Sequence, residues 1–188
     1  MSENTPTVLI VDDEVNITEL FGVWLESDYD VRTANSGEEA LEELDDSVDV
    51  VLLDRRMPGL SGDEVLEEIR EAGYDCRVAM VTAVDPDFDV IEMGFDDYLT
   101  KPIDREGLES AIESLLGRKE YDDAMQEYYA LVSKKAALES SKPPSELSAS
   151  DEYAELEADI EALEDELEGS LETEEDFESA FRDLDSPE

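Results

Sequence analysis

Residues 48–62 read VDVVLLDRRMPGLSG: an apolar run stops at Asp54, and two arginines and a Met-Pro-Gly turn follow it. A short run of valine and leucine bounded by turn residues is typical of a parallel strand that is buried on both faces. A carboxylate at the end of such a strand is either a turn residue or part of a functional site. The role of Asp54 therefore depends on what the other strands carry at their ends.

Four other segments extend this pattern and bring the number of expected strands to five. Val8–Val11 and Val78–Val81 are fully apolar, like Val48–Leu53 apart from its one aspartate. Asp30–Ala34 and Asp97–Leu99 are weaker candidates because they are more polar or shorter. Each run is short enough for a strand and too short for a buried helix.

Amphipathic stretches with helical spacing separate these strands. The expected helices are Val15–Glu26, Glu38–Leu44, Asp63–Glu71, a short helix at Asp87–Met93, and Asp104–Leu116. Ser36 and Ser61 each stand three residues before a glutamate, which is the pattern of a capping box that opens a helix. Strand and helix alternate five times in residues 5–117, which predicts one doubly wound α/β domain with a five-stranded parallel sheet.

The carboxyl ends of the expected strands carry a set of polar residues. Asp12 and Asp13 follow the first strand, Asp54 follows the third, Thr82 follows the fourth and Lys101 follows the fifth. Since these ends share one edge of a parallel sheet, three carboxylates, a hydroxyl and an ammonium are expected to meet there. Crowded carboxylates raise one another's pKa, and a hard divalent cation such as Mg²⁺ relieves their repulsion.

Each of these residues also has an ordinary structural interpretation. Asp12 or Asp13 could cap the following helix, Thr82 suits a strand, and Lys101 alone would be a surface charge. Asp54 alone would be a turn residue. Their occurrence in one ordered set favours the functional interpretation.

The set resembles the receiver domain of two-component response regulators, the CheY-like family. The shared landmarks are an acid pair after the first strand, an aspartate followed after two residues by Met-Pro-Gly, then Thr-Ala, and then Lys-Pro. The resemblance covers residues 5–117 and implies a flavodoxin-like sheet with strand order 2-1-3-4-5. It also implies that the domain is a signalling switch and not a turnover enzyme.

The resemblance implies a magnesium-dependent phosphoacceptor site. Asp54 would be the phosphoacceptor, and Mg²⁺ would be bound by Asp12, Asp13, Asp54 and the backbone carbonyl of Arg56. Asp54 would attack a phosphoryl group as a carboxylate nucleophile and form an acyl phosphate. The donor would be a partner histidine kinase.

Other residues receive supporting roles from the same resemblance. Thr82 and Lys101 would hold phosphoryl oxygens, and a cis peptide between Lys101 and Pro102 would aim the ammonium inward. On phosphorylation Thr82 would move toward the phosphoryl group and Tyr98 would turn inward, which would remodel a surface for partners. Pro58 and Gly59 would shape the loop after the phosphoacceptor.

Two features depart from the family pattern. Eighteen residues separate Thr82 from Lys101, about three fewer than is usual in the family. The helix at Asp87–Met93 should therefore lose most of a turn. For this reason we do not assume the dimer interface that the family commonly forms with this face. The pair Arg55-Arg56 is expected at the mouth of the acidic pocket and not as an ion-pair partner of Asp54. There it would meet a kinase, shield the acyl phosphate or soften the local field.

The sequence changes character after Gly117 and predicts a helical extension over residues 118–169. A long helix is expected at Lys119–Glu139, followed by a Pro/Ser linker over residues 140–150. Apolar residues then recur at spacings of three and four, which fits either a coiled coil or a two-helix hairpin: Tyr153, Leu156, Ile160, Leu163 and Leu167. Residues 170–188 are expected to form a frayed acidic tail. The extension resembles the HalX extension that follows receivers in haloarchaea.

Composition restricts the possible functions. The chain has 188 residues, no histidine and a single cysteine, Cys76, which excludes a Cys/His metal site, His-based catalysis and an internal disulfide. A net charge of −43, with 13 basic and 56 acidic residues, favours a halophilic source. Without a leader-like or membrane-length apolar segment, a soluble cytoplasmic protein without a membrane partner is expected.

Alternative functions remain at this point. A haloacid dehalogenase-like phosphatase needs a second aspartate two residues after its nucleophile, and here that position holds Arg56 after Asp54 or Glu14 after Asp12. A DNA-binding regulator needs a dense basic face, which the acidic extension lacks. Protein contact or homodimerisation through the C-terminal helices is favoured, and DNA contact is the alternative.

Salt should stabilise the fold strongly. At low ionic strength the carboxylates of a chain with net charge −43 repel one another, and molar salt reduces the Debye length to about 3 Å. We therefore expect the free energy of unfolding to rise when KCl increases from about 0.1 to about 2 M. Urea unfolding followed by circular dichroism measures this, and a fold of equal stability in dilute buffer without divalent ions would refute the halophilic interpretation.

Overall fold

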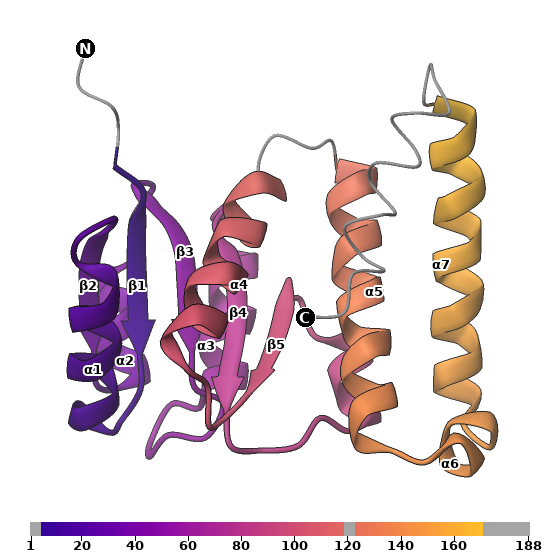
Figure 1. Cartoon of the computed structure of the whole chain (residues 1–188), viewed down its shortest axis with the longest axis horizontal. Helices are drawn as coiled ribbons and strands as arrows, with labels where there is room; N and C mark the ends of the chain where they lie inside the picture. The colour runs from indigo at the N-terminus through magenta and orange to yellow at the C-terminus, as the bar shows by residue number, and fades with distance from the viewer. Residues whose placement is uncertain (1–4, 119–122, 171–188) are drawn as a thin grey trace.

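The computed structural model describes residues 5–118 and 123–170 and contains one five-stranded sheet with helices around it (Figure 1). The strands are β1 Thr7–Val11, β2 Asp30–Ala34, β3 Val48–Leu53, β4 Arg77–Thr82 and β5 Asp97–Thr100. The first helices are α1 Val15–Leu25, α2 Gly37–Glu43, α3 Gly62–Glu71 and α4 Arg105–Arg118. All neighbouring strands are parallel and their order is β2-β1-β3-β4-β5, which confirms the predicted flavodoxin-like fold class.

The sheet is buried on both faces, which explains its continuous apolar strands. Alternate residues of a strand point to opposite faces. In β3, Val50 and Leu52 pack with the helices α1 and α4, whereas Val51 and Leu53 belong to the cluster on the other face. All four are fully buried. Two helical layers therefore enclose the sheet and leave its carboxyl edge open for a site.

Helix α3 begins tightly against the strand that ends in Asp54. Ser61 accepts a hydrogen bond from the backbone N–H of Glu64, and the Glu64 carboxylate accepts one from the Ser61 N–H, which completes the predicted capping box. Ser36 caps α2 in the same way, but there the Glu39 carboxylate accepts from the N–H of Asn35 instead. The capping box at Ser61 brings the start of α3 close to Asp54.

The segment expected to form a short helix at Asp87–Met93 contains only the 3-10 helix η1, Phe88–Glu92. The sequence predicted a helix shortened by most of a turn. The structure has no α-helix in this segment, so the shortening is larger than predicted. The short connection between Thr82 and Lys101 leaves too few residues for an α-helix that also spans the face of the sheet. Its apolar residue Val90 is nevertheless buried.

The C-terminal helices form an antiparallel hairpin. It consists of α5 Asp123–Ser141, the short α6 Pro144–Ser148 and α7 Asp151–Ser170. The predicted apolar stripe of α7 faces α5, and the Tyr153 hydroxyl donates to Glu139 at 2.7 Å. The segment predicted as a Pro/Ser linker is helical over α6, and most of the predicted acidic tail lies outside the described residues.

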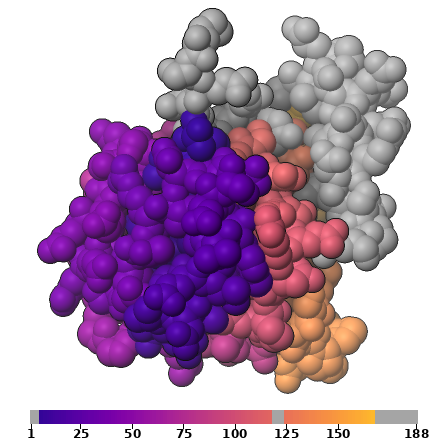
Figure 2. Space-filling model, turned by 60° about the vertical axis from the view of Figure 1, so that its left-hand side comes forward, coloured from indigo at the N-terminus to yellow at the C-terminus, as the bar shows by residue number. Residues whose placement is uncertain are grey.

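This hairpin packs against the α/β domain beside β5 and η1 (Figure 1). Figure 2 shows the orange surface of the hairpin adjoining the pink surface of the preceding residues. The apolar stripe of α7 is therefore buried within the chain, against α5 and η1. Within residues 5–118 and 123–170, no helix has both the length and the apolar character needed to cross a bilayer.

Gly62 should tolerate no side chain. A Cβ at this position would lie 2.0 Å from the carbonyl oxygen of Asp54, so Gly62→Ala should destabilise the fold by about 3 kcal/mol through overpacking. Gly117 is the matched control, because a Cβ there would meet nothing within 4 Å. Denaturant unfolding in molar KCl should show a loss for Gly62→Ala and little change for Gly117→Ala, and equal stabilities would contradict the packing described.

Candidate functional site

The predicted site lies where β1 and β3 run side by side at the carboxyl edge of the sheet. The strand order reverses at β1, which is where open α/β sheets place their binding crevice. The backbone N–H of Asp54 donates to the carbonyl oxygen of Val11 at 2.9 Å, so the two strand ends hold each other in register. One carboxylate oxygen from each of Asp12, Asp13 and Asp54 lies within 4.8 Å of the others.

Asp12 is held in place from several sides and is 2% exposed. Its Oδ1 accepts the N–H of Glu14 at 2.9 Å, and Asn35 Nδ2 donates to its backbone oxygen at 2.9 Å. The N-cap residue of α1 is Glu14, which makes no side-chain cap, so neither Asp12 nor Asp13 is the N-cap residue. Sequence reasoning missed Asn35, because a lone asparagine after a strand carries no distinctive signal.

Lys101 reaches the carboxylates from the last strand of the sheet. Its Nζ lies 2.5 Å from Asp12 Oδ2 and 3.9 Å from Asp54 Oδ2. The backbone N–H of Lys101 donates to the carbonyl of Thr82 at 2.8 Å, and the peptide bond to Pro102 is cis. The ammonium thus lies against the buried Asp12, whereas Asp13 is exposed.

The electrostatics of the cluster favour a bound cation. Burial, followed by the charge of Asp12, raises the pKa of Asp54, while Lys101 and the Thr82 hydroxyl oppose this rise. One ammonium therefore does not balance three carboxylates. Oxygen ligands from carboxylates beside an open, hydrated position suit Mg²⁺, so the residues present fit this ion.

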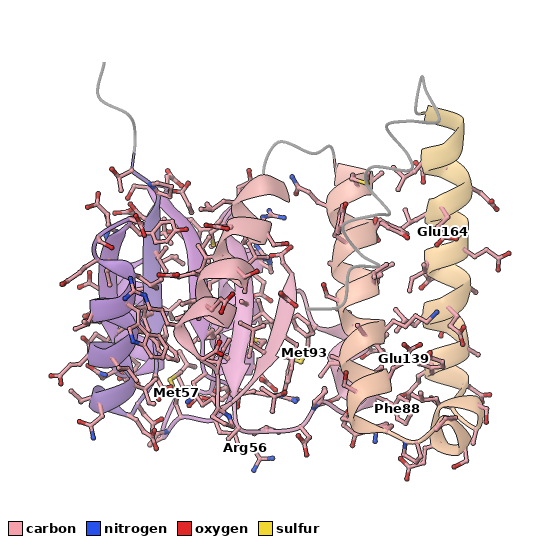
Figure 3. All side chains as sticks on the ribbon, in the orientation of Figure 1. Arg56, Met57, Phe88, Met93, Glu139 and Glu164 are labelled. Atoms are coloured by element: carbon pink, nitrogen blue, oxygen red, sulfur yellow. The ribbon has the colours of Figure 1, made fainter. Side chains whose placement is uncertain are left out.

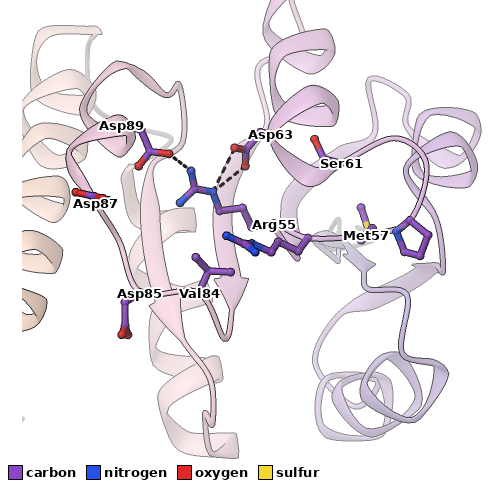
Figure 4. A pocket seen from close by; sticks show the side chains of 10 residues that line it. Arg55, Met57, Ser61, Asp63, Val84, Asp85, Asp87 and Asp89 are labelled. Atoms are coloured by element: carbon purple, nitrogen blue, oxygen red, sulfur yellow. Dashed lines mark hydrogen bonds and ion pairs between the residues drawn. The ribbon is translucent and has the colours of Figure 1, made fainter.

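The two arginines after Asp54 differ in their surroundings. Arg56 is exposed and extends from the carboxyl edge of the sheet, as expected (Figure 3). Arg55 is 8% exposed, so its expected place at the open mouth of the pocket is wrong. Its Nε donates to Asp63 at 3.0 and 3.2 Å, and its Nη2 donates to Asp89 (Figure 4).

Arg55 lines a groove of about 610 Å³ beside the acidic cluster. Further lining residues come from the loop after Asp54, the start of α3, the segment before η1 and η1 itself: Arg56, Met57, Pro58, Ser61, Asp63, Val84, Asp85, Asp87 and Asp89 (Figure 4). Gly59, next in this loop, has φ +76°, a conformation that favours glycine. The loop residues Pro58 and Gly59 are exposed, and the structure gives them no part in the acidic cluster.

Tyr98 is directed into the protein. It is 7% exposed, and its hydroxyl donates to the carbonyl oxygen of Val84 at 2.6 Å. Burial raises the pKa of Tyr98, and the nearby Arg55 opposes part of that rise. The inward position that the resemblance associates with phosphorylation is therefore already occupied here.

Comparison with known proteins agrees with this geometry. Residues 8–113 match the family described as the response regulator receiver domain, and residues 117–181 match the HalX domain. A solved BeF3-activated DrrB receiver domain is 32% identical, covers 61% of this chain and 99% of its own, and has a TM-score of 0.56. TrrA from Thermotoga maritima, solved with Mg(2+)-BeF, is 36% identical with a TM-score of 0.53, covering 59% of this chain and 99% of its own.

Curated relatives extend the likeness beyond the receiver. A Haloferax volcanii protein, named as a candidate transcriptional regulator, is 48% identical over 165 residues, which are 87% of this chain and 28% of that protein. A Haemophilus influenzae homolog of the transcriptional regulatory protein CpxR is 44% identical over 115 residues, which are 59% of this chain and 50% of that protein. The chain thus spans half or less of the length of these relatives.

Asp54 should oppose folding when no metal is bound. Because its folded-state pKa is raised, its ionised form is penalised in the folded state; the penalty is absent below the unfolded pKa and develops as pH rises through the folded value. Asp54→Asn should therefore be more stable than wild type at neutral pH without Mg²⁺, and the difference should vanish near about pH 3.

Mg²⁺ should reverse this order, because it stabilises the wild type more than Asp54→Asn. Urea unfolding with and without Mg²⁺ measures both effects. The exposed Asp46 outside the cluster provides the matched control Asp46→Asn, which should respond to Mg²⁺ like the wild type. An Asp54→Asn protein that gains as much stability from Mg²⁺ as the wild type would contradict the site.

Proposed function

Because this chain belongs to the response regulator receiver family, with a HalX domain after the receiver, we propose that Asp54 accepts a phosphoryl group from a partner histidine kinase. The observation that carries the proposal is the convergence of Asp12, Asp13 and Asp54 within 4.8 Å, with Lys101 beside them. The 188 residues contain no histidine, so the donor lies outside them.

The transfer exchanges one bond for another. The P–N bond of a phosphohistidine breaks, a P–O bond forms to a carboxylate oxygen of Asp54, and the imidazole nitrogen keeps the electron pair. Asp54 is 7% exposed, so the attacking carboxylate has already lost most of its hydration before the reaction. Such a transfer depends on positioning and charge neutralisation.

The surrounding residues supply these two conditions. Lys101 places an ammonium near Asp54 and neutralises a phosphoryl oxygen, and the Thr82 hydroxyl donates to another. Asp12, Asp13, Asp54 and the backbone carbonyl of Arg56 would hold Mg²⁺, which supplies further positive charge for the phosphoryl oxygens when bound. Asn35 fixes the backbone of Asp12 and thereby the ligand set.

The family consists of regulatory domains and not of turnover enzymes, and the CpxR homolog is named as a transcriptional regulatory protein. A phosphatase of the haloacid dehalogenase type would need an acid/base carboxylate two residues after Asp54. Arg56 occupies that position and cannot transfer a proton at neutral pH. The acyl phosphate is then a signalling state and not a step in turnover.

For the output we propose contact with protein, which the charge of the hairpin supports over contact with DNA. Helix α7 contains no Lys or Arg, and α5 contains two neighbouring lysines, Lys134 and Lys135. Lys134 is buried against the receiver half, so it is not available to phosphates. DNA binding needs several phosphate contacts from basic side chains, and the described hairpin does not offer them.

Phosphorylation of Asp54 tests the proposal directly. The full chain is incubated in molar KCl with acetyl phosphate and Mg²⁺, and intact mass spectrometry measures the added phosphoryl group. We expect one Mg²⁺-dependent phosphoryl group on the wild type, none on Asp54→Asn, and a rate lowered by about 10²-fold or more in Lys101→Ala, because a charge-stabilising group is lost. Phosphorylation of Asp54→Asn at the wild-type rate would reject Asp54 as the acceptor.

A further inference from the structure

We propose that Arg55 is a positioning residue that transmits the state of Asp54 to the C-terminal hairpin, an inference that rests on the function proposed above. Arg55 follows Asp54 directly in the chain. Its carbonyl oxygen accepts the N–H of Gly62 at 2.8 Å, which ties its backbone to the start of α3. Because Arg55 is adjacent to Asp54 and hydrogen-bonded to α3, a change in the Asp54 backbone acts on the link between β3 and α3.

The guanidinium of Arg55 joins two elements that make no other ion pair with each other among the described residues. Asp63 belongs to α3 and Asp89 belongs to η1, and Figure 4 shows Arg55 between them. The Arg55 side chain is 9% exposed, whereas those of Asp63 and Asp89 are 43% and 56% exposed. Burial alone disfavours a charged guanidinium, but Asp63, Tyr98 and Asp89 more than offset this and raise the pKa of Arg55.

Even so, a compensated buried ion pair is often no more stabilising than well-packed apolar side chains. An apolar side chain of similar size would fill the space without the desolvation penalty. What an apolar residue cannot provide is a directional link between α3 and η1. Because Arg55 directly follows Asp54 in the chain, this link joins η1 to the site as well as to α3.

The C-terminal hairpin packs against η1. Lys134 Nζ donates to the carbonyl oxygen of Ile91 at 3.0 Å, and Lys142 Nζ lies 3.0 Å from Asp87, directly before η1. The same two ammonium groups lie over the rings of Phe95 and Phe88, at 5.4 and 4.8 Å from the ring centroids. Both α5 and α7 contact η1, so a movement of η1 changes the surface on which the hairpin is seated.

The switch residue Tyr98 lies on the same path. The Tyr98 hydroxyl donates a hydrogen bond to the carbonyl oxygen of Val84, which lies between Thr82 and η1. Arg55 is near enough to Tyr98 to oppose part of the rise that burial causes in the pKa of its hydroxyl. Arg55 thus interacts with Tyr98 at the end of the segment that starts at Thr82, and with Asp89 within that segment. A structural path of this kind supports coupling only if breaking it uncouples the two ends.

Hydrogen exchange on the full chain tests this inference. Backbone amide exchange of α5 and α7 is measured in molar KCl, with and without acetyl phosphate and Mg²⁺, and intact mass gives the phosphorylated fraction. We expect phosphorylation to change exchange in the wild type. In Arg55→Gln, Asp54 should be phosphorylated as in the wild type, while the change in the hairpin falls by about threefold or more.

Two further variants complete the experiment. Asp89→Asn removes the η1 half of the link while Arg55 keeps Asp63, so it should show the same loss even if Arg55→Gln folds poorly. Arg105→Gln is the matched control, since Arg105 forms an exposed pair with Glu109 on α4 and should leave the response unchanged.

The outcomes separate the inference from the proposed function. If the wild type is not phosphorylated, both fail. If the phosphorylated wild type shows no change in α5 and α7, or if Arg55→Gln and Asp89→Asn keep the full change, only the role of Arg55 is overturned. Exchange that rises equally with and without the phosphoryl donor in both variants would also overturn it, because Arg55 would then be merely structural.

Discussion

The parallel pairing of β1 and β3 is the constraint on which the rest of the molecule depends. It brings Asp12 and Asp54 to adjacent strand ends, where the backbone N–H of Asp54 donates a hydrogen bond to the carbonyl oxygen of Val11. Burial and the neighbouring charge of Asp12 raise the pKa of Asp54, so the site disfavours having all its carboxylates ionised without added positive charge. A cation, an ammonium and a transferring phosphoryl group are the chemical partners of such a site. The helices around the sheet hold this unfavourable arrangement together by burying the apolar residues of the same strands.

Much of the fold followed from the sequence because its signals were local. Runs such as Val48–Leu53 have one reasonable interpretation, and the capping box at Ser61 marked the start of a helix correctly. The acidic cluster could be predicted because a parallel sheet places the ends of its strands at one edge, whatever their distance in sequence. Asp12, Asp54 and Lys101 lie up to 89 residues apart and still meet.

The features that the sequence did not predict depend on partners from distant elements. Nothing near Arg55 indicates that its side chain turns away from the open edge toward Asp63 and Asp89. The length of the segment before β5 suggested a shortened helix, but it did not indicate that the segment would contain only a 3-10 helix. The apolar stripe of α7 was visible, yet a stripe does not identify its partner, and hairpin and coiled coil use the same spacing. Here α5 and η1 provide that partner.

The packing of the hairpin against the receiver also determines where the chain can be truncated without exposing apolar surface. By family, the receiver ends before residue 117, but its packing does not end there. Phe88, Ile91 and Phe95 belong to the receiver half and are covered in part by α5 and α7, and β5 is an edge strand. A receiver isolated at residue 117 would present this apolar patch and a free strand edge to other molecules, which is the combination that promotes self-association. The hairpin thus protects the sheet from aggregation, in addition to any part it takes in signalling.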